Sequence, residues 1–193
     1  MANQSPIQTA FDPYATPKSR VGDVPAAEET RPMFFPVGLS KLTIMTVGTW
    51  GIYEFYWFYQ NWKSVRQLTG EKLNAPVRAL SYPLTSFSLF PRIRDQGQRL
   101  QVAFTVRPGV LATVVLLWNA LWRLPDPYWI ISFLGFVPLL YVQSAVNKIN
   151  QQVAPGSNPN TRLGAWNIVA LIAGAALLAL VVVGMLLGEE GAA

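Results

Sequence analysis

The chain has 193 residues, of which 51% are hydrophobic and 13% charged, and its formal net charge is +5. It contains no cysteine and no histidine, which excludes disulfides, thiolate nucleophiles, Cys/His zinc sites, imidazole bases and histidine-ligated haem. In so apolar a chain, excess positive charge is typical of contact with anionic lipid, so we expect lipid partners and no nucleic acid.

Residues 1–33 are predicted to form a disordered tail that precedes a helical membrane domain over residues 34–188. The tail is rich in Pro, Ala, Ser, Thr and mixed charge and has no apolar periodicity. Such a composition buries too little apolar surface to become ordered. It also lacks the apolar core of a signal peptide.

The first hydrophobic unit, residues 39–62, allows two interpretations. Its charge-free run, Leu42 to Tyr53, is shorter than the roughly 20 residues needed to cross a bilayer, which favours a re-entrant or interfacial segment with the N-terminus inside. The dense aromatic residues of 50–62 also suit the interface. Alternatively the unit spans, with Lys41 and Glu54 snorkelling near its two ends and the N-terminus outside.

The stretch 63–107 is strongly basic, with only two acidic residues against Lys63, Arg66, Lys72, Arg78, Arg92, Arg94, Arg99 and Arg107. The positive-inside rule therefore predicts a cytoplasmic loop. The four arginines nearest the second hydrophobic unit, Arg92, Arg94, Arg99 and Arg107, are candidate lipid contacts. Each basic residue beside an anionic leaflet contributes about 1 kcal/mol, although simple positive-inside anchoring is the favoured explanation of these arginines.

Within this stretch an amphipathic interfacial helix is predicted over residues 74–94, from four apolar residues at helical spacing, Val77, Leu80, Leu84 and Phe87. Such a helix lies on the inner membrane surface or packs against the helical bundle. Pro83 is expected to kink it and Pro91 to end it.

The second and third hydrophobic units, residues 108–124 and 127–147, are separated by a short proline-rich turn and predict a helical hairpin. Charged Arg123 and Asp126 lie at its tip, where aromatic residues also gather, Trp118, Trp122, Tyr128 and Trp129. This combination is typical of a membrane–water interface. We expect the tip to lie outside and the following loop, with Lys148 and Arg162, inside.

The fourth unit, residues 165–187, belongs to a charge-free stretch from Leu163 to Gly188 that is long enough to span. The chain is therefore predicted to be an all-α integral membrane protein with three to four transmembrane helices and its C-terminus outside. Small residues four apart, at Ala170 and Gly174 and again at Gly184 and Gly188, predict close approach to another helix.

Two groups of polar residues in these units are candidate functional sites. Glu54 is the acidic residue inside a hydrophobic unit, where a carboxylate costs about 2.5–3.5 kcal/mol at mid-bilayer. It either forms a proton or cation site or pairs with a neighbouring Lys or Arg and fixes helix depth. Gln143, Asn147 and Asn150 share one helical face and either line a polar cavity or tie segments together by hydrogen bonds.

The aromatic run from Thr49 to Trp62 resembles the signature T-x-G-I-Y-x-x-Y-W-F-Y-x-N-W of an uncharacterised family of bacterial multi-pass inner-membrane proteins with a domain of unknown function. Leu89–Arg94, the Asn147/Asn150 pair and Trp166–Asn167 are also similar to that family. The resemblance implies a bacterial inner-membrane location and no known activity. It adds four signature residues to Glu54 as candidate functional residues, Tyr53, Trp57, Asn61 and Trp62.

No phosphate-binding loop, nucleophile elbow or metal-ligand cluster is evident in the sequence, so we expect no enzymatic activity, no cofactor and no metal ion. The leading hypothesis is a non-enzymatic scaffold or accessory protein that binds membrane-protein partners, a second copy of itself or anionic lipid. The alternative is a small transporter or channel component that uses Glu54 and the amide-bearing helix face.

Overall fold

The computed structural model describes residues 31–125 and 128–190, and within them the chain is helical, without strands. The α-helices are α1 (Leu39–Gly48), α2 (Ile52–Thr69), α3 (Ala75–Leu80), α4 (Tyr82–Arg99), α5 (Pro108–Ala120), α6 (Val137–Val153) and α7 (Ala165–Glu190). Two 3-10 helices, η1 (Leu121–Arg123) and η2 (Tyr128–Phe136), lie between α5 and α6. The predicted all-α class is confirmed. The predicted tail up to residue 30 lies outside the described residues.

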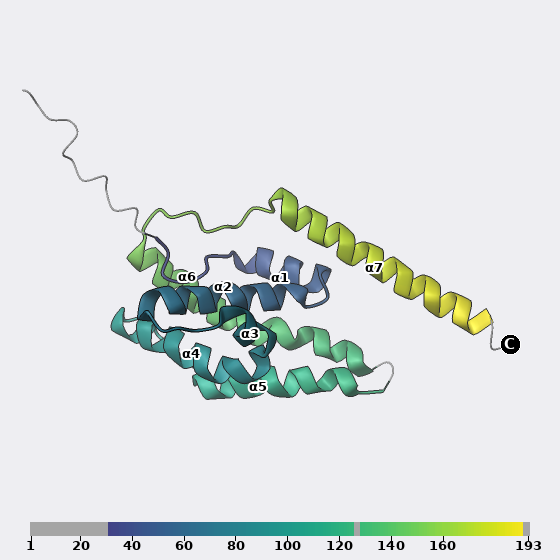
Figure 1. The fold of residues 1–193 in the computed structure, drawn as a ribbon, viewed down its shortest axis with the longest axis horizontal. Helices are drawn as coiled ribbons and strands as arrows, with labels where there is room; N and C mark the ends of the chain where they lie inside the picture. The colour runs from purple at the N-terminus through teal and green to yellow at the C-terminus, as the bar shows by residue number, and fades with distance from the viewer. Residues whose placement is uncertain (1–30, 126–127, 191–193) are drawn as a thin grey trace, which may run out of the picture.

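The first hydrophobic unit is a hairpin of two helices. The chain breaks between α1 and α2, where Trp50 and Gly51 both take the left-handed conformation, with φ of 55° and 83°. Thr49 supports the turn, because its hydroxyl donates to the Met45 carbonyl at 2.6 Å and accepts from the Tyr53 amide at 3.0 Å. Helix α2 returns beside α1, so both open ends of the hairpin lie at one end of the helical body (Figure 1).

The basic stretch 63–107 is largely folded rather than a loop. The helix predicted over 74–94 is two helices, with α3 capped by the Asn74 side chain, which accepts from the Val77 amide at 3.2 Å. The chain breaks at Ser81, and Pro83 occupies the first turn of α4, where a proline needs no amide partner.

The prediction that Pro91 ends this helix is wrong, since α4 continues to Arg99. A proline inside a helix removes one backbone hydrogen bond and costs about 3 kcal/mol. The neighbouring side chains of Leu89, Phe90 and Ile93 are fully buried, and their burial, at about 1.5–3 kcal/mol each, outweighs that cost. The core therefore holds both halves of α4 in one helix.

The second and third hydrophobic units form the predicted hairpin, with α5 leading to the tip and η2 and α6 returning against it (Figure 1). The difference from expectation is that the chain is 3-10 helical on both sides of the tip. Arg123 closes η1, whereas the tip residue Asp126 lies outside the described residues.

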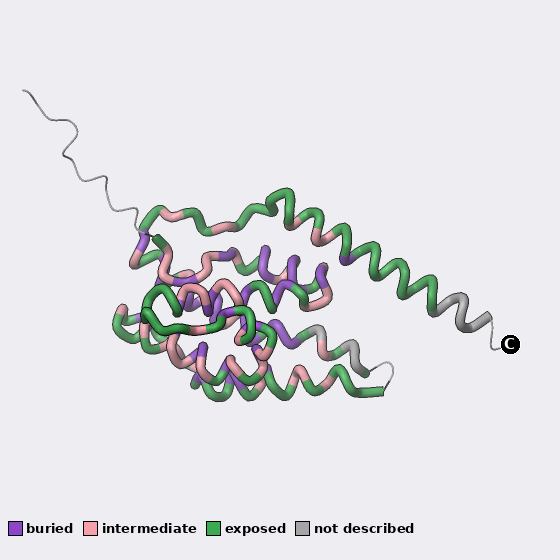
Figure 2. Tube along the Cα trace, viewed as in Figure 1, coloured by how far each residue is buried: buried purple, intermediate pink, exposed green. Residues whose placement is uncertain are grey.

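The core lies among α2, α4, α5 and α6. Its largest buried side chains include Trp57, Phe58 and Trp62 from α2, which pack with Leu89, Phe90 and Ile93 of α4 and with Leu139, Val146 and Ile149 of α6. Figure 2 shows burial concentrated in this body, whereas α7 is exposed along most of its length.

Helix α7 extends away from the body (Figure 1) and contacts α1, where Gly174 meets Gly48. A Cβ added to Gly174 would collide with the carbonyl of Gly48, so small residues permit this contact, as the Ala170–Gly174 pair predicted. By length and composition, α7 contains the one helical segment in the described chain that could cross a membrane, Ala165–Gly184, with mean hydropathy 2.5. The prediction of three to four spans is therefore not confirmed.

Candidate functional site

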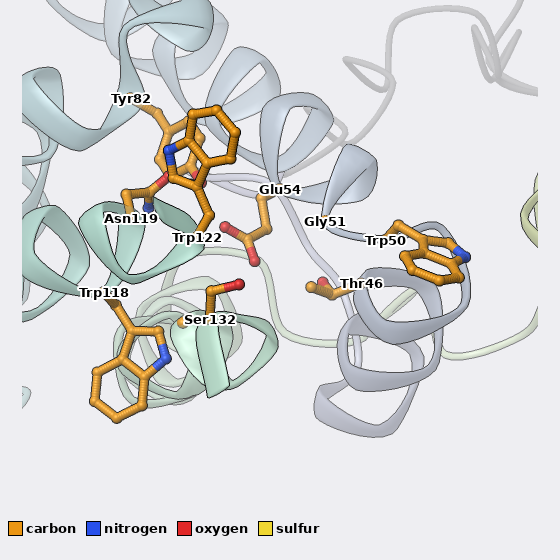
Figure 3. Close-up of a pocket in the computed structure, with 10 residues that line it drawn as sticks. Thr46, Trp50, Gly51, Glu54, Tyr82, Trp118, Asn119, Trp122 and Ser132 are labelled. Atoms are coloured by element: carbon orange, nitrogen blue, oxygen red, sulfur yellow. The ribbon is translucent and has the colours of Figure 1, made fainter. Parts of the chain in front are cut away.

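A polar pocket forms where the tips of the two hairpins meet (Figure 3). The volume of this cavity, which we call the Glu54 pocket, is about 140 Å³. Residues of α1, the α1–α2 turn, α2, α4, α5, η1 and η2 form its walls. The lining residues are Thr46, Trp50, Gly51, Glu54, Tyr82, Trp118, Asn119, Trp122, Ser132 and Gly135.

Among the described residues that line this pocket, Glu54 carries the one carboxylate. It lies in the first turn of α2, where the helix dipole favours a negative charge, and only 6% of the residue is exposed. Its carboxylate points into the cavity (Figure 3). The expected pairing with a neighbouring Lys or Arg is not observed, because the ion pairs within the described residues join Arg92 to Glu71 and Arg94 to Asp95.

The remaining polar groups of the pocket differ in how they are satisfied. The Tyr82 hydroxyl donates to Asn119 Oδ1 at 2.8 Å, and Asn119 Nδ2 donates to the Val115 carbonyl at 3.0 Å. In contrast, the Thr46 hydroxyl is buried and has no hydrogen-bond partner among the described residues. The pocket thus combines a fixed tyrosine–asparagine wall with a carboxylate and an unused hydroxyl.

The predicted polar face of α6 binds the backbone of the segment that precedes α1. Asn150 makes two hydrogen bonds with Phe34, accepting from its amide at 3.0 Å and donating to its carbonyl at 2.9 Å. Asn147 Nδ2 donates to the Val37 carbonyl at 3.0 Å, and Gln143 Nε2 donates to the Phe35 carbonyl at 3.2 Å.

Two signature residues of α2 complete this arrangement. Asn61 Oδ1 accepts from the Phe35 amide at 3.3 Å, and Trp57 Nε1 donates to Gln143 Oε1 at 2.6 Å. We call Asn61, Gln143, Asn147 and Asn150 the amide clamp. The amide clamp binds the backbone of residues 34–37, so these side chains hold that segment against α2 and α6 and do not line a cavity with Glu54.

Two further signature residues, Trp62 and Tyr53, are buried in the hydrophobic core. Trp62 is fully buried, with the Arg78 guanidinium 4.5 Å and the Arg92 guanidinium 5.8 Å from its ring centroid. Tyr53 is 7% exposed, and its ring lies 5.6 Å from that of Tyr56. Neither Trp62 nor Tyr53 lines the Glu54 pocket.

The four candidate lipid-contacting arginines lie on α4 and just before α5. Arg92 is held by both carboxylate oxygens of Glu71 at 3.0 Å, and Arg94 lies 3.2 Å from Asp95. Arg99 ends α4 and Arg107 precedes α5, and both are exposed. The arginines are therefore divided between two with acidic partners and two at exposed helix ends.

Sequence reasoning missed the surroundings of Lys41. Instead of snorkelling at a helix end, Lys41 is 5% exposed, and its ammonium donates to Asn160 Oδ1 at 2.8 Å and to the Arg162 carbonyl at 2.9 Å. Asn160 also donates to the Pro36 carbonyl at 3.0 Å. These partners lie more than a hundred residues apart in the chain, so no local pattern could have revealed them.

Comparison with family models, with curated proteins and with solved structures gives no match to this chain. The two sites must therefore be interpreted from their own chemistry.

Proposed function

We propose that the chain is a non-enzymatic scaffold or accessory protein of the bacterial inner membrane that binds membrane partners and anionic lipid. The observation that carries this proposal is the exposure of α7. Most of the apolar segment Ala165–Gly184 is exposed, with Gly174 buried where it meets α1, and at about 1.5 Å per residue its 20 residues match a bilayer core of about 30 Å. Lipid or a partner helix is needed to cover this surface.

The hairpins support a membrane placement for more than α7. Apolar side chains at and beside the hairpin tips are exposed, among them Val47, Ile52, Leu117, Trp122 and Ile131. The four apolar residues of the predicted interfacial helix are also exposed, Val77, Leu80, Leu84 and Phe87. We place these surfaces in or on the bilayer, because contiguous exposed apolar surface is typical of membrane contact.

A hairpin that enters and leaves at one end of the body favours the re-entrant interpretation of residues 39–62. The tail then lies on the same side as the basic stretch 63–107 and the loop before α7. The positive-inside rule assigns that side to the cytoplasm, and the end of α7 to the outside.

The transporter alternative is less well supported. It requires Glu54 and the amide face to line one pathway, but Gln143, Asn147 and Asn150 bind the backbone of residues 34–37. None of the three contributes to the Glu54 pocket.

Cysteine labelling tests the topology, since the chain has no native cysteine. In cells treated with a membrane-impermeant maleimide, we expect Ala192→Cys to react, and Arg31→Cys and Ser157→Cys to react only after lysis. Reaction of Arg31→Cys in intact cells would make residues 39–62 a span. Protection of Ala192→Cys would contradict a membrane-spanning α7.

Lipid retention tests the binding role. Replacing Arg92, Arg94, Arg99 and Arg107 with Gln should weaken anionic lipid binding by about fivefold per residue, since each charge contributes about 1 kcal/mol. Mass spectrometry of lipid that co-purifies with the protein measures the loss. Arg123→Gln, at the hairpin tip, is the control and should retain anionic lipid. Equal retention by all variants would contradict the role of the basic stretch.

A further inference from the structure

The Glu54 carboxyl group is buried in the pocket beside the Tyr82 hydroxyl. A buried carboxylate is costly unless a cation or a proton neutralises it. No Lys or Arg within the described residues forms an ion pair with Glu54, although the carboxylate faces an open cavity (Figure 3). The pocket therefore has the electrostatic character of a cation site.

The pocket is better suited to an organic cation than to a metal ion. Of its three lining tryptophans, Trp122 lies beside Glu54, whereas the rings of Trp50 and Trp118 turn away from the carboxylate (Figure 3). The N–H groups of Trp50 and Trp118 are directed to backbone carbonyls of Gly174 and Ile131, at 3.2 and 2.7 Å. Within the described residues, no group of three or more acidic, histidine or cysteine side chains could hold a metal ion.

The hydroxyl groups distinguish between kinds of ammonium group. Thr46 Oγ1 is buried and lacks a hydrogen-bond partner in the described chain, and Ser132 adds a second hydroxyl to the lining. A primary ammonium group has three N–H donors for such oxygens, like a lysine ammonium. A quaternary ammonium group has none and would leave Thr46 unsatisfied.

The size of the cavity agrees with this chemistry. A volume of about 140 Å³ corresponds to roughly four or five water molecules at about 30 Å³ each. That space admits an ammonium group with a short carbon chain, and it exceeds what one bare metal ion would fill.

We propose that the Glu54 pocket binds a primary ammonium group, with the Glu54 carboxylate as counter-ion and the Thr46 hydroxyl as a further acceptor. The group belongs either to a small soluble amine or to the headgroup of an aminophospholipid. This inference goes beyond the proposed scaffold role and does not depend on it.

Tryptophan fluorescence of the purified full-length protein in detergent provides the assay, because three tryptophans line the pocket. Ethanolamine and dihexanoyl phosphatidylethanolamine are titrated as probes, and choline and dihexanoyl phosphatidylcholine are the matched quaternary controls. Glu54→Gln should weaken binding at least tenfold, because the negative counter-charge is lost while an acceptor oxygen remains. Thr46→Val should weaken binding about threefold to tenfold, because a hydrogen bond to a charged group is lost. Asp95→Asn, an exposed acid outside the pocket, should bind like the unaltered protein.

Saturable binding of ethanolamine that Glu54→Gln weakens supports a site for a soluble amine, and binding of the ethanolamine lipid alone supports a headgroup site. Equal affinity for the choline and ethanolamine probes would overturn the assignment, as would a lack of binding at millimolar probe. Circular dichroism and gel filtration establish whether Glu54→Gln folds. If it does not, Thr46→Val decides, because it removes only the hydroxyl, and unchanged affinity in that variant refutes the proposal.

Discussion

The amide clamp makes a quantitative prediction about the segment that it holds. Asn150 is 4% exposed and satisfies both backbone groups of Phe34. Asn150→Ala removes two hydrogen bonds and leaves a buried amide and carbonyl without partners, at about 1–3 kcal/mol for each group. We expect residues 34–37 to open more easily by about 2–6 kcal/mol.

Cysteine protection measures this opening directly. Val37 is fully buried, so Val37→Cys in the otherwise cysteine-free chain should react with a maleimide only when the segment opens. Because about 1.4 kcal/mol corresponds to a tenfold change in an equilibrium, Asn150→Ala should accelerate labelling of the purified protein by at least about thirtyfold.

The matched control is Gln152→Ala, which removes an exposed amide from the same helix. Both substitutions place alanine in α6, so the gain in helix propensity largely cancels, and the control should label at nearly the original rate. If Asn150→Ala accelerates labelling by less than about threefold, the clamp does not hold the segment, and our account of the α6 amides is wrong.

Two further predictions concern the contacts around this body. Gly174→Val should displace α7 from α1, because a Cβ at Gly174 collides with the Gly48 carbonyl. Gly184→Val, with open space around the residue, should leave α7 in place. Cross-linking of cysteines placed in α1 and α7 measures the difference, and equal cross-linking yields for the two variants would contradict the contact. Glu71→Gln should lower the free energy of unfolding by no more than about 1 kcal/mol, because its ion pair with Arg92 is partly exposed; a larger loss in a detergent unfolding titration would show that this pair supports the core.

Much of the helical framework could be predicted from the sequence. Hydrophobic runs long enough to form helices, a proline-rich turn between two of them and a charge-free final stretch are local properties, and local properties determine which segments become helical. The hairpin ending near Arg123 and the long α7 follow from them. The small residues at Gly174 also predicted a close helix approach, although not its partner at Gly48.

Where local signals conflict with packing, the sequence alone gave the wrong answer or left two possibilities open. Pro91 is a strong helix breaker by itself, but the buried neighbours Leu89, Phe90 and Ile93 keep α4 continuous. Residues 39–62 permitted a span or a re-entrant segment, and the left-handed turn at Trp50 and Gly51 forms a hairpin instead of one helix.

Composition and short-range pattern determined that the chain is helical and highly apolar, that its basic stretch lies between the first two hydrophobic units, and that Glu54 and the α6 amides are unusual. Only the tertiary structure decided what those polar groups contact. Glu54 faces a pocket formed by both hairpin tips, and Asn150 binds Phe34, 116 residues away in the chain. A hydrogen-bond partner at that separation is determined by how the helices pack, so the periodicity within one helix cannot predict it.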